Sequence, residues 1–165
     1  MCRSNSSKEM KEIQMRNAEL IPEIVQLLNE GHTITLKLKG YSMRPFLENN
    51  RDKALITKAQ NIKKGDAVLA EVSAGVYVLH RVIKIQGNDV TLRGDGNLTN
   101  EYCHRSDVKG FVIGFYRKGR TTIEKTNSPK WLLYSWLWMW LFPIRRYLLA
   151  FHRHIWLRLF PVKLA

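Results

Sequence analysis

The segment VYVLHRVIKIQGNDVTLRGDGN, residues 76–97, indicates the fold of this chain more clearly than any other stretch. Two runs rich in β-branched residues, at about residues 76–85 and 90–93, lie on either side of the turn signal QGND. A second turn signal, GDGN, ends the segment. Because β-branched residues favour strands and Gly, Asn and Asp favour turns, the segment predicts two short strands separated by a tight turn.

The same pattern of short strands extends on both sides of this segment. In TITLKLK, residues 33–39, apolar and polar residues alternate with a period of two, which is typical of a half-buried strand. Further strands are expected at about residues 54–57, 67–72 and 108–117. No helical period appears between residues 33 and 117. We therefore predict a mainly β domain of about six strands over residues 32–117.

Residues 1–31 are expected to form a loose polar tail followed by an amphipathic helix. Apolar residues recur near helical spacing, with Pro22 expected to open the stronger part of the helix and Gly31 to end it. The recurring residues are Ile13, Leu20, Ile24, Leu27 and Leu28. No apolar stretch typical of a secretory signal peptide or an N-terminal anchor occurs in this part of the sequence.

The C-terminal part divides into a polar linker, residues 118–130, and a tryptophan-rich segment, residues 131–165. Fourteen uncharged residues, WLLYSWLWMWLFPI, would reach about 21 Å as a helix, which is shorter than the ~30 Å hydrocarbon core of a bilayer. We therefore expect a helix lying in the membrane interface, or a re-entrant hairpin, with the arginines at the headgroups. The residues expected at the membrane are Trp131, Trp136, Trp138, Trp140, Arg145 and Arg146. The alternatives are a tilted span over residues 131–151, and a tryptophan-rich packing helix or dimer surface.

The composition supports a basic protein with one core. The chain has 165 residues, of which 45% are hydrophobic, and 27 Lys and Arg against 14 Asp and Glu give a formal net charge of +13. Such a charge favours an anionic partner, and tryptophan interleaved with leucine favours a membrane surface over nucleic acid. Cys2 and Cys103 are too few for a disulfide framework. No metal or cofactor is expected, because Cys103-His104 and His152-x-His154 lack zinc-site spacing.

A serine and a histidine are the candidate chemical groups. Ser42 lies in the turn-like stretch GYSMRPFL, residues 40–47, and His80 is the one histidine in the middle of an apolar strand. Histidine is the commonest base for activating a serine hydroxyl, and burial would keep its imidazole neutral. Taken singly, a serine in a turn and a histidine in a strand are more often structural.

Four motifs in order make the combination more specific. GYSMRPFL, GDAVL at 65–69, LHRVIKI at 79–85 and LRGDGN at 92–97 resemble those of the signal peptidase I family of serine endopeptidases, over about residues 33–117. LexA-type self-cleaving repressors are related. The resemblance implies an irregular signal-peptidase/LexA-like β domain, with Ser42 as nucleophile and its N–H in the oxyanion hole. His80 stands where the Ser/His branch carries its base and most bacterial enzymes carry lysine.

The resemblance also implies an orienting acid. Counted from the motif aspartate, Asp95, its position is Glu101, and Asp95 itself is the alternative. The residues around the serine, Tyr41, Met43 and Pro45, are expected to frame the substrate cleft.

The function expected from these residues is that of a membrane-associated serine endopeptidase that cleaves a leader or precursor peptide. The alternative is an inert basic domain of the same fold that binds a membrane surface or nucleic acid.

Overall fold

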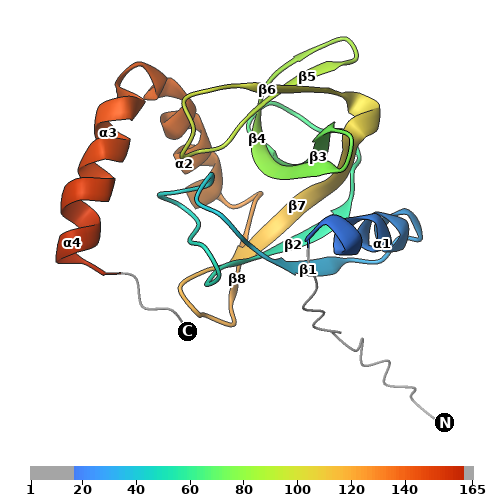
Figure 1. Cartoon of the computed structure of the whole chain (residues 1–165), viewed down its shortest axis with the longest axis horizontal. Coiled ribbons are helices and arrows are strands. Elements are labelled where there is room, and N and C mark those ends of the chain that lie inside the picture. Colours follow the sequence, from blue (N-terminus) through green and yellow to red (C-terminus); the bar gives the residue numbers. More distant parts are fainter. Residues whose placement is uncertain (1–16, 162–165) are drawn as a thin grey trace.

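The computed structural model describes residues 17–161, which form an antiparallel sheet with helices before and after it (Figure 1). The predicted tail over residues 1–8 and the expected helical position Ile13 lie outside this range. The strands are β1 Ile34–Lys37, β2 Lys53–Lys58, β3 Ala67–Ser73, β4 Val76–Gln86, β5 Asp89–Arg93, β6 Glu101–His104, β7 Val108–Tyr116 and β8 Ile123–Lys125. They are ordered β1-β2-β7-β3-β4-β5-β6, with β8 paired to β7. The predicted mainly β architecture is confirmed.

Strand β3 lies at the centre of the sheet, between β7 and β4. In β3, four consecutive residues from Ala67 to Ala70 are buried, because both faces of the strand are covered. Strand β4 pairs along most of its length with β3, whereas β5 pairs with it only from Arg81 onward. The first half of β4 therefore has one neighbouring strand and one edge without a strand partner among the described strands.

The six strands expected from alternation are all present, but the sheet has two more. Strand β6 was not predicted because EYCH is short and alternates between half-buried and exposed residues. The prediction that residues 118–130 form only a polar linker is wrong, because strand β8 lies within them and pairs with β7. Its polar sequence gave no strand signal, and pairing with β7 supplies the structure that local propensity does not.

Helix α1 Asn17–Asn29 packs on the sheet through buried residues that recur at helical spacing: Leu20, Ile21, Ile24 and Leu28. Pro22 lies inside the helix and not at its start, so that expectation is wrong. Burial of Leu20 and Ile21 in the core extends the helix to the N-terminal side of the proline. Gly31 follows the helix with a φ of 91°, a conformation that suits glycine at a helix end, as expected.

The C-terminal segment is a series of helices that begins on the sheet and continues away from it (Figure 1). They are α2 Pro129–Trp140, a 3-10 turn η2 Phe142–Ile144, α3 Arg145–Phe151, a π-helical turn η3 His152–Trp156 and α4 Leu157–Leu159. The alternative of a continuous span over residues 131–151 is wrong, because α2 ends at Trp140 just before Pro143. Within residues 17–161, no helix has both the length and the apolar character needed to cross a membrane.

One face of α2 belongs to the core of the β domain. Trp131 packs against Phe46 and Phe115, with ring centroids 4.7 Å and 5.0 Å away. Trp138 is also buried, and Arg145 is only 1% exposed. Membrane contact is therefore wrong for Trp131, Trp138 and Arg145, because these side chains point into the protein. Trp136 and Trp140 are exposed on the other face of α2, and Arg146 is exposed on α3.

Candidate active site

The turn that carries Ser42 is held by buried neighbours. Met43, Phe46 and Leu47 are in the hydrophobic core, whereas Ser42 is half-buried. Gly40 enters the turn with a φ of 90°, a conformation that favours glycine, and its N–H donates to Asn49 Oδ1 at 2.8 Å. The bulky residues around the serine therefore anchor the turn and leave the hydroxyl near the surface.

The RGDGN loop lies directly against this turn. The Gly96 N–H donates to the Ser42 carbonyl oxygen at 2.7 Å. A Cβ added at Gly94 would lie 2.3 Å from that same oxygen and 3.0 Å from His80 Nε2. A Cβ added at Gly96 would lie 2.7 Å from the Tyr41 carbonyl oxygen. Both glycines are therefore required by close approach, and the approach brings the serine turn and the histidine ring to one point.

His80 is held by burial and by a carboxylate. It lies in the middle of β4 and is 3% exposed. Its Nδ1 lies 2.5 Å from Glu101 Oε2, and since a carboxylate accepts, Nδ1–H is the donor. Burial lowers the pKa of His80 from its ordinary value of 6.5, and Glu101 and then Asp95 oppose that shift. The neutral imidazole therefore keeps its lone pair on Nε2, the nitrogen beside the serine turn.

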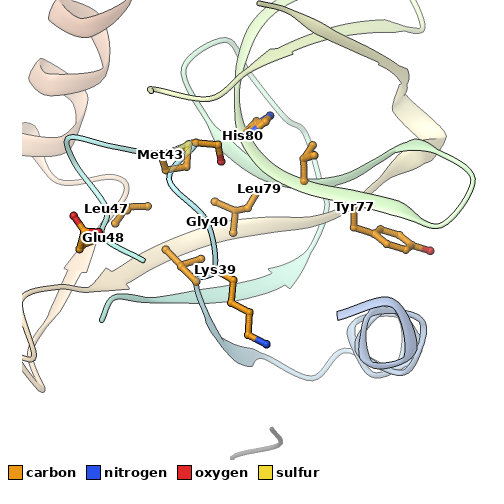
Figure 2. A pocket seen from close by; sticks show the side chains of 11 residues that line it. Lys39, Gly40, Met43, Leu47, Glu48, Tyr77, Leu79 and His80 are labelled. Atoms are coloured by element: carbon orange, nitrogen blue, oxygen red, sulfur yellow. The ribbon is translucent and has the colours of Figure 1, made fainter. Parts of the chain in front are cut away.

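Ser42 and His80 line the same pocket of about 120 Å³ (Figure 2). One wall is the chain from Leu38 to Gly40 and the other is β4 from Tyr77 to His80. Among residues 17–161, no hydrogen bond joins Ser42 Oγ to His80 and none occupies the Ser42 N–H. Catalytic hydrogen bonds of this kind often tighten only with substrate, and a free N–H at the serine is what an oxyanion hole needs.

The expected cleft residues are only partly found in this pocket. Met43 lines it, but Tyr41 and Pro45 do not belong to its lining. Tyr41 is 56% exposed, and the Arg44 guanidinium lies over its ring at 4.1 Å. Glu48 lines the pocket and was not predicted; its carboxylate is bound by Arg44 at 2.6 Å.

Asp95 does not orient His80. Its carboxylate pairs with Arg81 through two hydrogen bonds of 2.8 Å and 2.7 Å, and both residues are buried. Glu101, and not Asp95, is the carboxylate that contacts the His80 ring. Arg81 also donates to the Gly65 carbonyl oxygen at 2.8 Å. One buried arginine therefore ties together the GDAVL, LHRVIKI and LRGDGN motifs.

Three residues of α2 also reach this ion pair; the sequence analysis did not single out Tyr134 or Ser135 and placed Trp138 at the membrane. Tyr134 Oη donates to Asp95 Oδ2 at 3.1 Å, and Trp138 Nε1 donates to the Asp95 carbonyl oxygen at 3.0 Å. Arg81 Nη1 donates to Ser135 Oγ at 2.5 Å. The spacing of Trp131, Ser135 and Trp138 along one helix face is the signal that could have found them.

Metal-binding side chains do not gather elsewhere in the described part of the chain. Within residues 17–161, no group of three or more His, Cys, Asp or Glu side chains is placed to hold a metal ion. His104 lies 3.0 Å from Asp89 at the surface.

Comparison with known proteins gives one family. A family model described as Peptidase S24-like matches residues 6–109. The matched range contains Ser42, His80, Asp95 and Glu101 and ends before α2. A search among curated proteins finds no significant match.

Proposed function

Because the chain belongs to the peptidase S24-like family, which is related to LexA-type peptidases and signal peptidase I, we propose that it is a serine endopeptidase with Ser42 as nucleophile and His80 as general base. The observation that carries this proposal is the 2.5 Å contact between His80 Nδ1 and Glu101 Oε2. It directs the basic Nε2 toward the turn that holds Ser42.

Lysine is a common base in this family, and one lysine does line the pocket. Lys39 is exposed, and Figure 2 shows its ammonium group pointing away from His80. A lysine acts as a general base only when burial or a nearby cation lowers its pKa. The buried, carboxylate-bound His80 meets the requirement for a base better than this solvated ammonium group does.

The proposed reaction is an acyl transfer to Ser42. His80 Nε2 takes the Ser42 proton while Oγ attacks the peptide carbonyl carbon, and the Ser42 N–H donates to the resulting oxyanion. Glu101 stabilises the imidazolium that forms. His80 then gives the proton to the leaving amine, and a water activated by the same nitrogen hydrolyses the acyl-enzyme.

An extended peptide is the substrate that suits this pocket. Strand β1 pairs only with β2 among the described strands, and Val76–His80 of β4 pairs only with β3. These two partner-free edges continue into the two walls of the pocket. An extended chain can add to such edges through main-chain hydrogen bonds, and a pocket of about 120 Å³ favours a small side chain beside the scissile bond. A leader or precursor peptide, cleaved as by signal peptidase I, has this character.

Association with an anionic membrane surface is part of the proposal. The outer face of the C-terminal helices exposes large apolar side chains, and no Asp or Glu follows Glu124 in the sequence. The basic residues Arg146, Arg153 and Arg158 are exposed on the same helices. Aromatic side chains combined with arginines are typical of helices that lie in a bilayer interface. The exposed apolar residues include Leu133, Trp136, Trp140, Tyr147, Phe151, Trp156 and Leu159.

The test is cleavage of a library of extended peptides by the full chain, with products identified by mass spectrometry. Wild type should cut after small residues, and Ser42→Ala should leave every peptide intact. Cleavage that persists in Ser42→Ala would remove Ser42 as the nucleophile. A wild-type protein that cuts no peptide would leave the inert binding domain as the better description.

A further inference from the structure

We propose that helix α2 is a positioning element of the active site, and that Tyr134 and Trp138 are positioning residues that act on Ser42 and His80 through Asp95. This inference rests on the proposed peptidase function. It assigns a positioning role in the active site to a segment outside residues 6–109, the range matched by the family model.

Asp95 is held by hydrogen bonds from β4 and from α2. Arg81 binds both carboxylate oxygens, Tyr134 Oη donates to Oδ2, and Trp138 Nε1 donates to the carbonyl oxygen. Ser135 Oγ accepts from the same Arg81 at 2.5 Å. Asp95 is 1% exposed and Arg81 is fully buried. Moving one member of a buried ion pair away from the other is strongly destabilising, because no water is present to replace the lost partner. The Arg81–Asp95 pair therefore holds both residues in place.

The two chain neighbours of Asp95 lie against the serine turn. Its preceding neighbour, Gly94, approaches both the Ser42 carbonyl oxygen and His80 Nε2. Its following neighbour, Gly96, donates its N–H to the Ser42 carbonyl oxygen at 2.7 Å. The glycines on both sides have no side chain to resist a shift. A displacement of Asp95 is therefore passed directly to the serine turn and to the space beside the histidine.

Helix α2 is fixed relative to the sheet. Trp131 packs against Phe46 of the serine turn at 4.7 Å, and the Arg81 guanidinium lies 4.7 Å from the Trp131 ring centre. The Tyr134 and Trp138 rings stack with an interplanar angle of 12°. Since these rings have little freedom, the Tyr134 hydroxyl and the Trp138 indole N–H are held in place before substrate binds.

The experiment compares the full chain with point variants, using a fluorophosphonate that reacts with activated serines. Trp138→Phe removes the donor to the Asp95 carbonyl oxygen, and Tyr134→Phe removes the donor to its carboxylate. Leu132→Met, at a 56%-exposed position of the same helix, is the matched control. The limiting labelling rate (kinact) and half-saturating probe concentration (KI) are measured against pH and normalised to the folded fraction from circular dichroism.

We expect Trp138→Phe to lower kinact about tenfold with KI changed less than twofold, because small misplacements of reacting groups are costly. Tyr134→Phe should also shift the pH midpoint of labelling upward. The negative charge of Asp95 raises the pKa of His80, and without the Tyr134 hydroxyl that charge is less neutralised and acts more strongly on His80. Leu132→Met should match wild type.

Two results overturn the inference. If Trp138→Phe and Tyr134→Phe label at the wild-type rate per folded molecule, with an unchanged pH midpoint, α2 stabilises the fold but does not position the active site. If wild type itself fails to label at Ser42, the proposed function fails and this inference fails with it. Labelling of wild type combined with unaltered Trp138→Phe and Tyr134→Phe contradicts only the positioning role.

Discussion

At the scale of single residues, the account depends on the contact between His80 and Glu101. Glu101 was found by counting six residues from Asp95, and the structure places it at His80 Nδ1. Asp95, the alternative acid, is fully engaged with Arg81. In the proposed site the two carboxylates therefore have two tasks, with Glu101 orienting His80 as the base and Asp95 supporting the loop.

Replacing Glu101 tests the first of these tasks. Glu101→Gln keeps the size of the side chain but removes the charge that fixes the imidazole tautomer and stabilises the imidazolium. The rate of peptide cleavage should fall by a factor approaching about 10⁴, the loss seen when the orienting acid of a well-studied triad is neutralised. Asp89→Asn, an exposed carboxylate on the neighbouring strand, should leave the rate unchanged. A Glu101→Gln enzyme within threefold of wild type would reduce the site to a dyad.

The lowered pKa of His80 predicts a particular pH dependence. Because burial moves it below its ordinary value of 6.5, the base stays neutral, and the acid limb of the kcat/KM profile should lie below pH 6.5. The same shift acts on stability. Below pH 6.5 the unfolded chain binds a proton that folded His80 resists, so the free energy of unfolding should fall as pH decreases toward the folded pKa. Chemical denaturation between pH 5 and pH 8 measures this, with His80→Gln as the control that lacks the contribution. An acid limb above pH 7 would contradict the assignment.

At the scale of elements, the sequence predicted the strands that show alternation and the contacts that follow from motif spacing. It did not predict the contacts between residues far apart in the chain. The six strands with clear alternation were found, and the structure brings His80 into contact with Glu101 and into one pocket with Ser42. Strand β6 was missed although it carries Glu101, because its four residues are shorter and more exposed than a typical strand signal. The contacts of Tyr134, Ser135 and Trp138 with Asp95 and Arg81 were missed because these partners lie 39 to 54 residues away in the chain. A helix rich in tryptophan and leucine has the same sequence pattern whether its apolar face packs on a protein core or contacts a membrane.

The glycine loop gives a prediction at this scale. Gly94→Ala would place a Cβ 2.3 Å from the Ser42 carbonyl oxygen, a backbone atom that cannot move without moving the serine turn. We expect it to lower stability by roughly 1–3 kcal/mol, as overpacking does, and to abolish cleavage. Gly87→Asn is the control, since Gly87 has φ 58°, which asparagine tolerates, and open space around it. Thermal unfolding and peptide cleavage measure the two effects. Wild-type cleavage by a folded Gly94→Ala variant would show that the close approach is not required.

At the scale of the whole molecule, the C-terminal helices have two faces with different partners. The inner face of α2 packs on the β domain and reaches the Arg81–Asp95 pair. The outer face and the helices that follow expose aromatic side chains among arginines. The simple division into a β domain and a separate membrane tail therefore does not hold. Removing residues 131–165 would uncover Phe46 and Phe115 and break the bonds to Asp95.

The outer face predicts binding to anionic vesicles. Each basic residue near such a surface contributes roughly 1 kcal/mol, which salt screens, so binding should weaken as salt is raised and should be weak on zwitterionic vesicles. The double variant Trp136→Ser/Trp140→Ser should bind less tightly at every salt concentration, because it loses apolar insertion. Tyr102→Ser, which removes an aromatic that is 68% exposed on β6, is the control. Vesicle cosedimentation measures all of these, and equal binding by the double variant and wild type would assign membrane contact to another surface.

Mapping the covalent adduct shows whether His80 activates Ser42 as a nucleophile. Wild type and His80→Ala are treated with a fluorophosphonate, digested, and analysed by mass spectrometry. The account predicts a single adduct on Ser42 in wild type and a loss of at least about 10³-fold in its rate of formation in His80→Ala, as for removal of a general base. An adduct on another residue, or an undiminished rate on Ser42 in His80→Ala, would contradict it.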